Sequence, residues 1–313
     1  MKQTLTAALA AATLTFSVIA VPAAADTRVT LKAAKAASSY YAMAVQLSEA
    51  AKSAAGLDVT VEESQGSVQN VKEAIRRPAG YVFTSPPSLI ASAQAAKKPF
   101  EGETGYDVVR GLFPIPSLTM HWVVREDSGV KTFADLAGKS FIAGGKGSFG
   151  ERKTGDVFAA LGIADKVSFV DVELNAAVPA LKNGQVAGFA TAGSYPAPNV
   201  TEAGAGTPIR LLSLSAADLE KVKGDQQVIP AGTYPGVSYD VTTISLPVNA
   251  YTVAATDDET AYKLTKAFWE SKAAMAKSNP WWGGVITSML ADMGATLHPG
   301  AAKYYAEAGI AVK

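Results

Sequence analysis

The chain has 313 residues, with 28 Lys and Arg against 28 Asp and Glu, and no cysteine. Without a positive surplus it has little to attract nucleic acid, and without cysteine it has no disulfide, thiolate metal site, cysteine nucleophile or lipid anchor on an N-terminal cysteine. Its length and an apolar content of 48% suit two ordinary domains with sizeable cores.

The first 25 residues are typical of a secretory signal peptide. Lys2 provides the positive start, residues 5–20 form a short apolar stretch, and Ala23-Ala24-Ala25 fits a cleavage site. The apolar stretch is short for a membrane span, and no later stretch reaches the required length. We expect cleavage after Ala25 and a mature protein that is free in the periplasm or outside the cell.

Short apolar strands and helices then alternate. Strands are expected at 29–31, 59–61 and 81–83, and each is followed by a loop and a helix. This rhythm predicts a mainly parallel sheet, in which ligands bind beyond the carboxyl ends of the strands. The three loops carry hydroxyl and amide side chains, and although each Ser or Thr alone could cap a helix, their convergence favours a binding site.

The middle of the chain starts a second β/α series. Strands are expected at 108–113 and 121–125, and the second of these should cross to another lobe. The series continues through 131–214, an apolar run at 242–254 brings the chain back, and a helical pattern follows from Asp257 onward. The sequence therefore predicts an α/β fold with two lobes.

The glycine-rich stretch at 144–151 joins the apolar residues 140–143 to a predicted helix. Glycines let a backbone approach a ligand closely, and the N–H groups of a first helical turn favour an anion. Lys146, Arg152 and Lys153 lie near that turn, where the helix dipole disfavours cations, so a bound anion would explain them. We interpret the stretch as one wall of a small-anion site.

Two other readings of this stretch stay open. Residues 145–150 match G-x-G-x-x-G, the dinucleotide-binding pattern, which is short and common. The stretch could also be a tight strand-to-helix turn without a ligand. A Walker A phosphate loop is excluded, because Gly147 follows Lys146 where Ser or Thr is needed.

No catalytic constellation is found in the sequence. The two histidines are His121, inside a predicted strand, and His298, beside Pro299 at a helix start. Neither a G-x-S-x-G elbow nor an H-E-x-x-H helix is present. The acids at 257–259 open a helix, where they suit the dipole, and the tryptophans read as core residues. We expect no enzyme activity, no metal and no cofactor.

Several motifs together resemble the TAXI family, the periplasmic solute-binding subunits of one branch of TRAP transporters. The resemblance covers essentially the whole mature chain. It is carried by residues 39–41, 61–70, 125–130, 135–139, 192–198, 229–236 and 297–305.

The resemblance implies a type II periplasmic-binding-protein fold. Residues 26–121 and 250–313 would form lobe I, and residues 122–249 lobe II. A monomer would capture a small carboxylate or dicarboxylate by lobe closure and deliver it to a TRAP permease driven by an ion gradient. The ligand-binding residues, from the sequence and the resemblance together, are expected to be Lys35, Ser38, Ser39, Tyr40, Gln65, Ser67, Asn70, Thr84, Lys146, Gly147, Ser148, Phe149 and Tyr195.

This chain departs from the family pattern in both ligand loops. The first usually has a Gly-Gly-Thr-Tyr-Tyr core but reads Ala-Ala-Lys-Ala-Ala-Ser-Ser-Tyr-Tyr at 33–41, and in the second Lys146, Phe149 and Gly150 replace Pro, Gly and Thr. Two lysines, Lys35 and Lys146, would then face the cleft and favour a more anionic solute, a dicarboxylate or a sulfonate. The alternatives are a binding protein of an ATP-driven importer and a nucleotide-dependent periplasmic enzyme.

Overall fold

The computed structural model describes residues 28–312, so the predicted signal peptide lies outside the described residues. The strands are β1 (Arg28–Lys32), β2 (Asp58–Glu62), β3 (Tyr81–Ser85), β4 (Val109–Arg125), β5 (Ser140–Ile142), β6 (Ser168–Phe169), β7 (Gly188–Gly193), β8 (Ile209–Leu211), β9 (Asp225–Ile229) and β10 (Val241–Val253). The α-helices are α1 (Ser39–Ala55), α2 (Ser67–Ala74), α3 (Pro87–Gln94), α4 (Phe149–Ala160), α5 (Leu174–Lys182), α6 (Pro198–Gly206), α7 (Ala216–Leu219), α8 (Asp258–Ser278) and α9 (Pro299–Glu307). Short 3-10 helices are η1 (Tyr106–Val108), η2 (Glu126–Ser128), η3 (Phe133–Leu136), η4 (Pro280–Gly284) and η5 (Thr287–Asp292).

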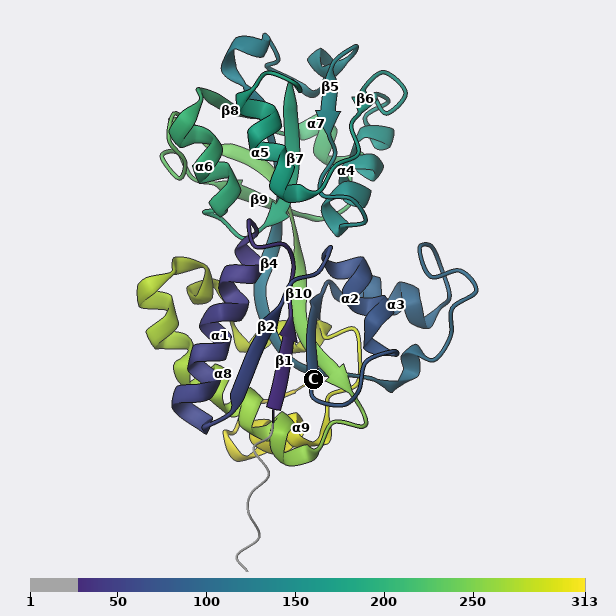
Figure 1. The fold of residues 1–313 in the computed structure, drawn as a ribbon, viewed down its shortest axis with the longest axis vertical. Helices are drawn as coiled ribbons and strands as arrows, with labels where there is room; N and C mark the ends of the chain where they lie inside the picture. The colour runs from purple at the N-terminus through teal and green to yellow at the C-terminus, as the bar shows by residue number, and fades with distance from the viewer. Residues whose placement is uncertain (1–27, 313) are drawn as a thin grey trace, which may run out of the picture.

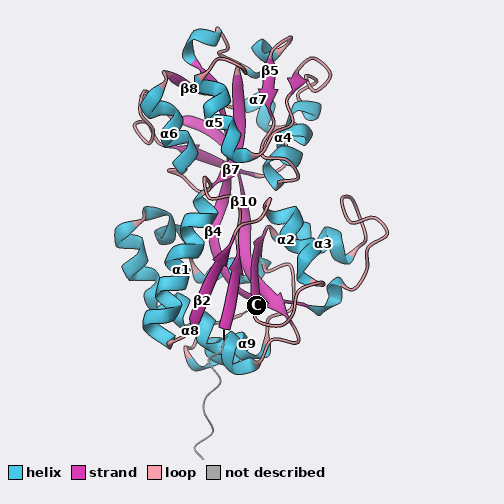
Figure 2. Cartoon of the chain, in the orientation of Figure 1, coloured by secondary structure: helices cyan, strands magenta, loops and turns pink. Residues whose placement is uncertain are grey.

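The elements form two parts joined by two long strands (Figure 1). The first part holds β1 to β3 with α1 to α3, α8 and α9, and the second holds β5 to β9 with α4 to α7. β4 and β10 run from one part into the other. In each part, helices lie on both sides of the strands (Figure 2).

The strands follow the order β2-β1-β3-β10-β4-β7-β5-β6, with β8 also paired to β4 and β9 to β10. The predicted parallel pairing is found toward both ends, where β1 pairs with β2 and β3, and β5 with β6 and β7. In the middle, β10 and β4 are antiparallel to each other and to the neighbouring strands β3 and β7. The carboxyl ends of both parallel sets therefore meet between the two parts.

The two strands expected at 108–113 and 121–125 are one continuous strand, β4. Its pairing with β10 shifts register between the pairs Val248–Ile115 and Leu246–Leu118, and Pro116 falls inside this shift. A proline is tolerated at such an irregularity, because no ladder hydrogen bond needs its missing N–H. Pro116 therefore marks a β-bulge within one strand.

Two hydrophobic clusters form the core. Neighbouring residues of one strand belong to different clusters, as Trp122 and Val123 do on β4, because successive side chains of a strand point to opposite faces. The larger cluster includes the fully buried Trp122 and Trp282. Within residues 28–312, no helix is both long and apolar enough to cross a membrane.

Candidate functional site

A small cavity of about 40 Å³ lies between the two parts. Its walls come from the loops that follow β1, β2 and β5, from the strands β3 and β7 near their carboxyl ends, and from the central strands. Eight of the predicted site residues line it: Lys35, Ser38, Tyr40, Gln65, Ser67, Thr84, Ser148 and Phe149. The predicted meeting of the strand-end loops with the glycine-rich stretch is therefore found.

Three helices from both parts begin at this cavity. The Ser38 hydroxyl caps α1 by accepting from the Tyr41 N–H at 3.2 Å, and the Ser148 hydroxyl caps α4 by accepting from the Glu151 N–H at 3.1 Å. At α2 the N-cap is Gly66, and within residues 28–312 no side chain caps this helix. Its first-turn N–H groups are therefore available to a ligand, and the positive ends of all three helix dipoles face the same space.

The glycines of the 144–151 stretch are needed for close packing. A Cβ on Gly144, whose φ is +148°, would lie 2.4 Å from the Glu151 nitrogen, and one on Gly145 would lie 2.8 Å from the Leu174 Cβ. The stretch is thus a tight strand-to-helix turn, and it also presents Ser148, Phe149 and Gly150 to the cavity. A cavity of 40 Å³ has no room for a dinucleotide.

The cations of this stretch do not face the cavity. The Lys146 ammonium lies 2.6 Å from Asp171 Oδ2, its side chain is 65% exposed, and the hydrogen bond to Asp171 raises its pKa. Arg152 donates to the carbonyl of Lys98 at 2.7 Å, and the Lys153 ammonium donates to a backbone carbonyl at Lys223. The charges that suggested a nearby anion are therefore satisfied by an exposed carboxylate and two carbonyls.

Lys35 alone carries a charge among the described residues that line the cavity. Its ammonium lies 3.3 Å from Glu173 Oε2 and 4.0 Å from Glu63 Oε2. The other oxygen of Glu173 accepts from the Gln65 Nε2 at 3.1 Å. Glu173, which sequence reasoning missed, is the N-cap residue of α5, and its side chain makes no capping hydrogen bond to its own helix.

Four of the other predicted site residues do not line the cavity. The Ser39 hydroxyl accepts from the backbone N–H of Ser194 at 3.0 Å, which joins the start of α1 to the end of β7. Asn70 is buried and donates to the carbonyls of Ala33 and Thr84, so it ties the ends of β1 and β3. Gly147 donates its N–H to Glu151, and Tyr195 lies outside the cavity.

Tyr195 lines a separate groove of about 570 Å³ between the two parts. None of the described residues that line it is charged. The Tyr195 hydroxyl accepts from the Gln227 Nε2 at 3.0 Å. The groove therefore lacks both the cation and the converging helix starts that the small cavity has.

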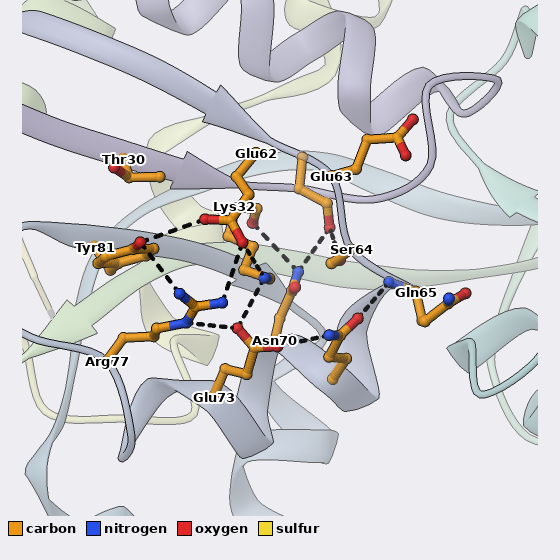
Figure 3. Close-up of polar contacts among 12 residues, drawn as sticks. Thr30, Lys32, Glu62, Glu63, Ser64, Gln65, Asn70, Glu73, Arg77 and Tyr81 are labelled. Carbon is orange, nitrogen blue, oxygen red and sulfur yellow. Dashed lines mark hydrogen bonds and ion pairs between the residues drawn. The ribbon is translucent and has the colours of Figure 1, made fainter.

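An ion network around the buried Lys32 holds α2 in place (Figure 3). The Lys32 ammonium lies 2.6 Å from Glu62 Oε1 and 2.8 Å from Glu73 Oε2, and Arg77 contacts both carboxylates. Burial acts to raise the pKa of Glu73, but hydrogen bonds from Lys32, Arg77 and Gln69 outweigh it and lower the pKa. These bonds fix α2 against β1 and β2, and so fix its N-terminus at the cavity.

Both histidines make hydrogen bonds that support the fold. The imidazole of His121 is fully buried, with Nδ1 3.0 Å from the Thr119 carbonyl and Nε2 2.8 Å from the Tyr234 hydroxyl. His298 is the N-cap of α9 and accepts from the Gly300 N–H. Within residues 28–312, no group of three His, Asp or Glu side chains is placed to hold a metal ion.

Two α/β parts joined by two strands that run between them, with a cavity at their junction, are the fold of the periplasmic binding proteins. The chain belongs to the NMT1-like family, whose model matches residues 31–309. The predicted α/β fold is confirmed by the arrangement of the strands and helices.

Solved structures of other proteins share this fold at low sequence identity. The periplasmic binding protein BugD is 14% identical, with a TM-score of 0.56 over 90% of this chain and 98% of its own. MatC from Rhodopseudomonas palustris, solved with bound malate, is 12% identical, with a TM-score of 0.55 over 90% of this chain and 96% of its own. ArgBP from T. maritima is 13% identical, with a TM-score of 0.50 over 82% of this chain and 93% of its own.

Proposed function

We propose that this protein is a periplasmic solute-binding protein that captures a small organic anion between its two parts. One observation carries the proposal: the N-termini of α1, α2 and α4, from both parts, converge on one cavity with Lys35 on its wall. Oriented N–H groups and positive helix ends bind an anion without a dedicated cation.

Capture would work by closure of the two parts as lobes. We propose that residues 26–121 with 250–313 form one lobe and residues 122–249 the other, and that β4 and β10 act as the hinge. Contacts across the cleft support a closed state, since Ser39 bonds Ser194, and a Cβ on Gly66 would lie 3.5 Å from the Ser148 Cβ. A ligand held by both lobes binds the closed state better and so shifts the population toward it.

We further propose that the loaded protein delivers its anion to a TRAP-type permease, as a member of the TAXI branch. Support comes from the motifs across the mature chain, among them 61–70 and 192–198. A neighbouring reading frame for a large membrane protein with many spans would agree with this partner. A neighbouring ATPase with a Walker A loop would instead indicate an ATP-driven importer.

The test is binding calorimetry with a panel of small carboxylates and sulfonates. Ala34→Leu places a larger side chain on the cavity wall and should abolish binding of any anion that the wild type binds. Ala36→Leu is the matched control, because Ala36 is exposed and does not line the cavity. Undiminished binding by the Ala34→Leu variant would show that the site lies elsewhere.

A further inference from the structure

The cavity is small and its charge is largely offset, and both features restrict what it can hold. The closed cavity measures about 40 Å³, against about 300–1,000 Å³ for a pocket that encloses a drug-sized ligand. So small a volume suits a compact acid with a few carbon atoms better than a longer one.

The charges at the cavity suit a single negative charge. Lys35 already faces Glu173 at 3.3 Å and Glu63 at 4.0 Å, so its ammonium is compensated by two carboxylates. The remaining attraction comes from three helix N-termini, each equivalent to about +0.5 charge. A second carboxylate on the ligand would have no cation of its own among the described residues that line the cavity.

The rest of the wall disfavours a ligand ammonium. Among the described residues that line the cavity there is no carboxylate, and the two acids nearby are held by Lys35. Leu118, Phe149, Leu174 and Val248 present apolar surface instead. An ammonium enclosed there would lose its water without gaining a carboxylate partner, which is unfavourable.

We infer that the anion is a compact monoanionic acid with a short apolar tail, and that dicarboxylates and amino acids are poor ligands. This inference rests on the proposed function and narrows it, because the closed cavity accepts one acid group and a few carbon atoms. The sequence favoured a dicarboxylate ligand because two lysines were expected to face the cleft. A monoanionic acid replaces that expectation, since Lys146 is paired with Asp171 and Lys35 with Glu173.

Calorimetry on the mature protein tests the inference with propionate, butyrate and methanesulfonate against succinate, malate, alanine and glutamate. At least one monoanionic acid should bind about tenfold or more tighter than every dicarboxylate and amino acid. A preference for succinate, malate, alanine or glutamate would overturn this inference alone. Binding of none of these compounds would overturn the proposed function together with it.

A size-switch variant adds a second readout. Val248 is buried and lines the cavity, so Val248→Ala should shift the preference toward a longer tail, by about fourfold for each added CH2 that becomes buried. Val228→Ala is the control, because Val228 is exposed on β9. If Val248→Ala lowers the melting temperature too far, Leu118→Val makes the same test with a smaller change. An unchanged chain-length preference in a folded variant would overturn the inference.

Discussion

The Lys35 ammonium lies 3.3 Å from the Glu173 carboxylate and joins the two parts across the cleft. Each member also has a second partner, since Lys35 faces Glu63 and Glu173 accepts from Gln65. The carboxylate at the start of α5 thus contacts residues that line the cavity from the opposite part. The pair sits at the rim, with the Glu173 side chain 46% exposed.

Glu173→Gln should raise the affinity for a monoanion by a few fold. The substitution keeps a polar side chain but removes the negative charge that offsets Lys35. An exposed pair contributes less than about 1 kcal/mol, which limits the gain to about fivefold. The measurement is calorimetry at low and high salt, and the gain should shrink with salt. Glu202→Gln, on α6, is the charge-matched control. A loss of affinity would show that the pair acts mainly to hold the closed state.

Gly193→Ala should weaken ligand binding by about tenfold or more. A Cβ there would lie 2.5 Å from the Ser39 hydroxyl oxygen, so the start of α1 and the end of β7 could not approach as they do. The affinity is measured by calorimetry and the separation of the parts by small-angle scattering.

The double variant Ser39→Ala with Gly193→Ala is the sharp control. Without the Ser39 hydroxyl the nearest Ser39 atom to the new methyl is Cβ at 3.7 Å, an ordinary contact. Affinity should recover toward that of Ser39→Ala alone. A double variant as weak as Gly193→Ala would contradict the proposed clash and point to a backbone effect.

Lys32→Ala should lower the free energy of unfolding by about 2–4 kcal/mol. Lys32 is 2% exposed and holds Glu62 and Glu73, which would be left close together without their shared cation. Urea unfolding measures the change, and Lys52→Ala, at an exposed helix position, should cost less than about 0.5 kcal/mol. Anion affinity should fall as well, because the network positions the start of α2. If Lys32→Ala and Lys52→Ala lowered the free energy of unfolding equally, the ion network would not stabilise the fold as proposed.

Stability should fall as the pH drops from about 7 to 5. Burial lowers the pKa of His121 from 6.5 to about 4 and also lowers that of His298. Below about pH 6.5 these histidines therefore bind protons in the unfolded chain but stay neutral in the folded chain, so a lower pH favours unfolding. His121 alone should cost about 2 kcal/mol at pH 5. This range lies above the titration of carboxylates such as Glu73, whose lowered pKa weakens the fold only at lower pH.

Urea unfolding at the two pH values checks this prediction. His298→Asn keeps a residue that can cap α9 but removes one titrating group, so the loss between the two pH values should become smaller. A variant with the same pH dependence as the wild type would show that His298 does not contribute.

Much of the fold could be predicted from local pattern. The alternation of short apolar strands with helices predicted parallel pairing, and β1 with β2 and β5 with β7 show it. Strand limits could not be predicted from local pattern, since the two strands expected at 108–113 and 121–125 are one strand, β4, which accommodates Pro116 at a register shift. Whether the missing N–H of a proline falls at such a shift depends on the partner strand, which the sequence alone does not show.

The outline of the cavity could be predicted, but the charges around it could not. Glycines, serines and helix starts mark strand-end loops by local chemistry, and these loops line the cavity. The direction of a long side chain is not local, since Lys146 could have pointed inward but is bonded to Asp171. Glu173 carried no signal beyond its place before a helix, because its partners Lys35 and Gln65 are more than a hundred positions away.

Local sequence was enough to predict the α/β alternation, the glycine-rich turn and the loops from which a cavity could be built. These depend on backbone conformation and on the period of apolar residues, which are properties of neighbouring positions. Which charges face the cavity, and which are paired with one another, depends on how the whole chain folds. Ion pairs form between whichever groups the crossing strands bring within reach, and that distance is set by the packing of the whole chain.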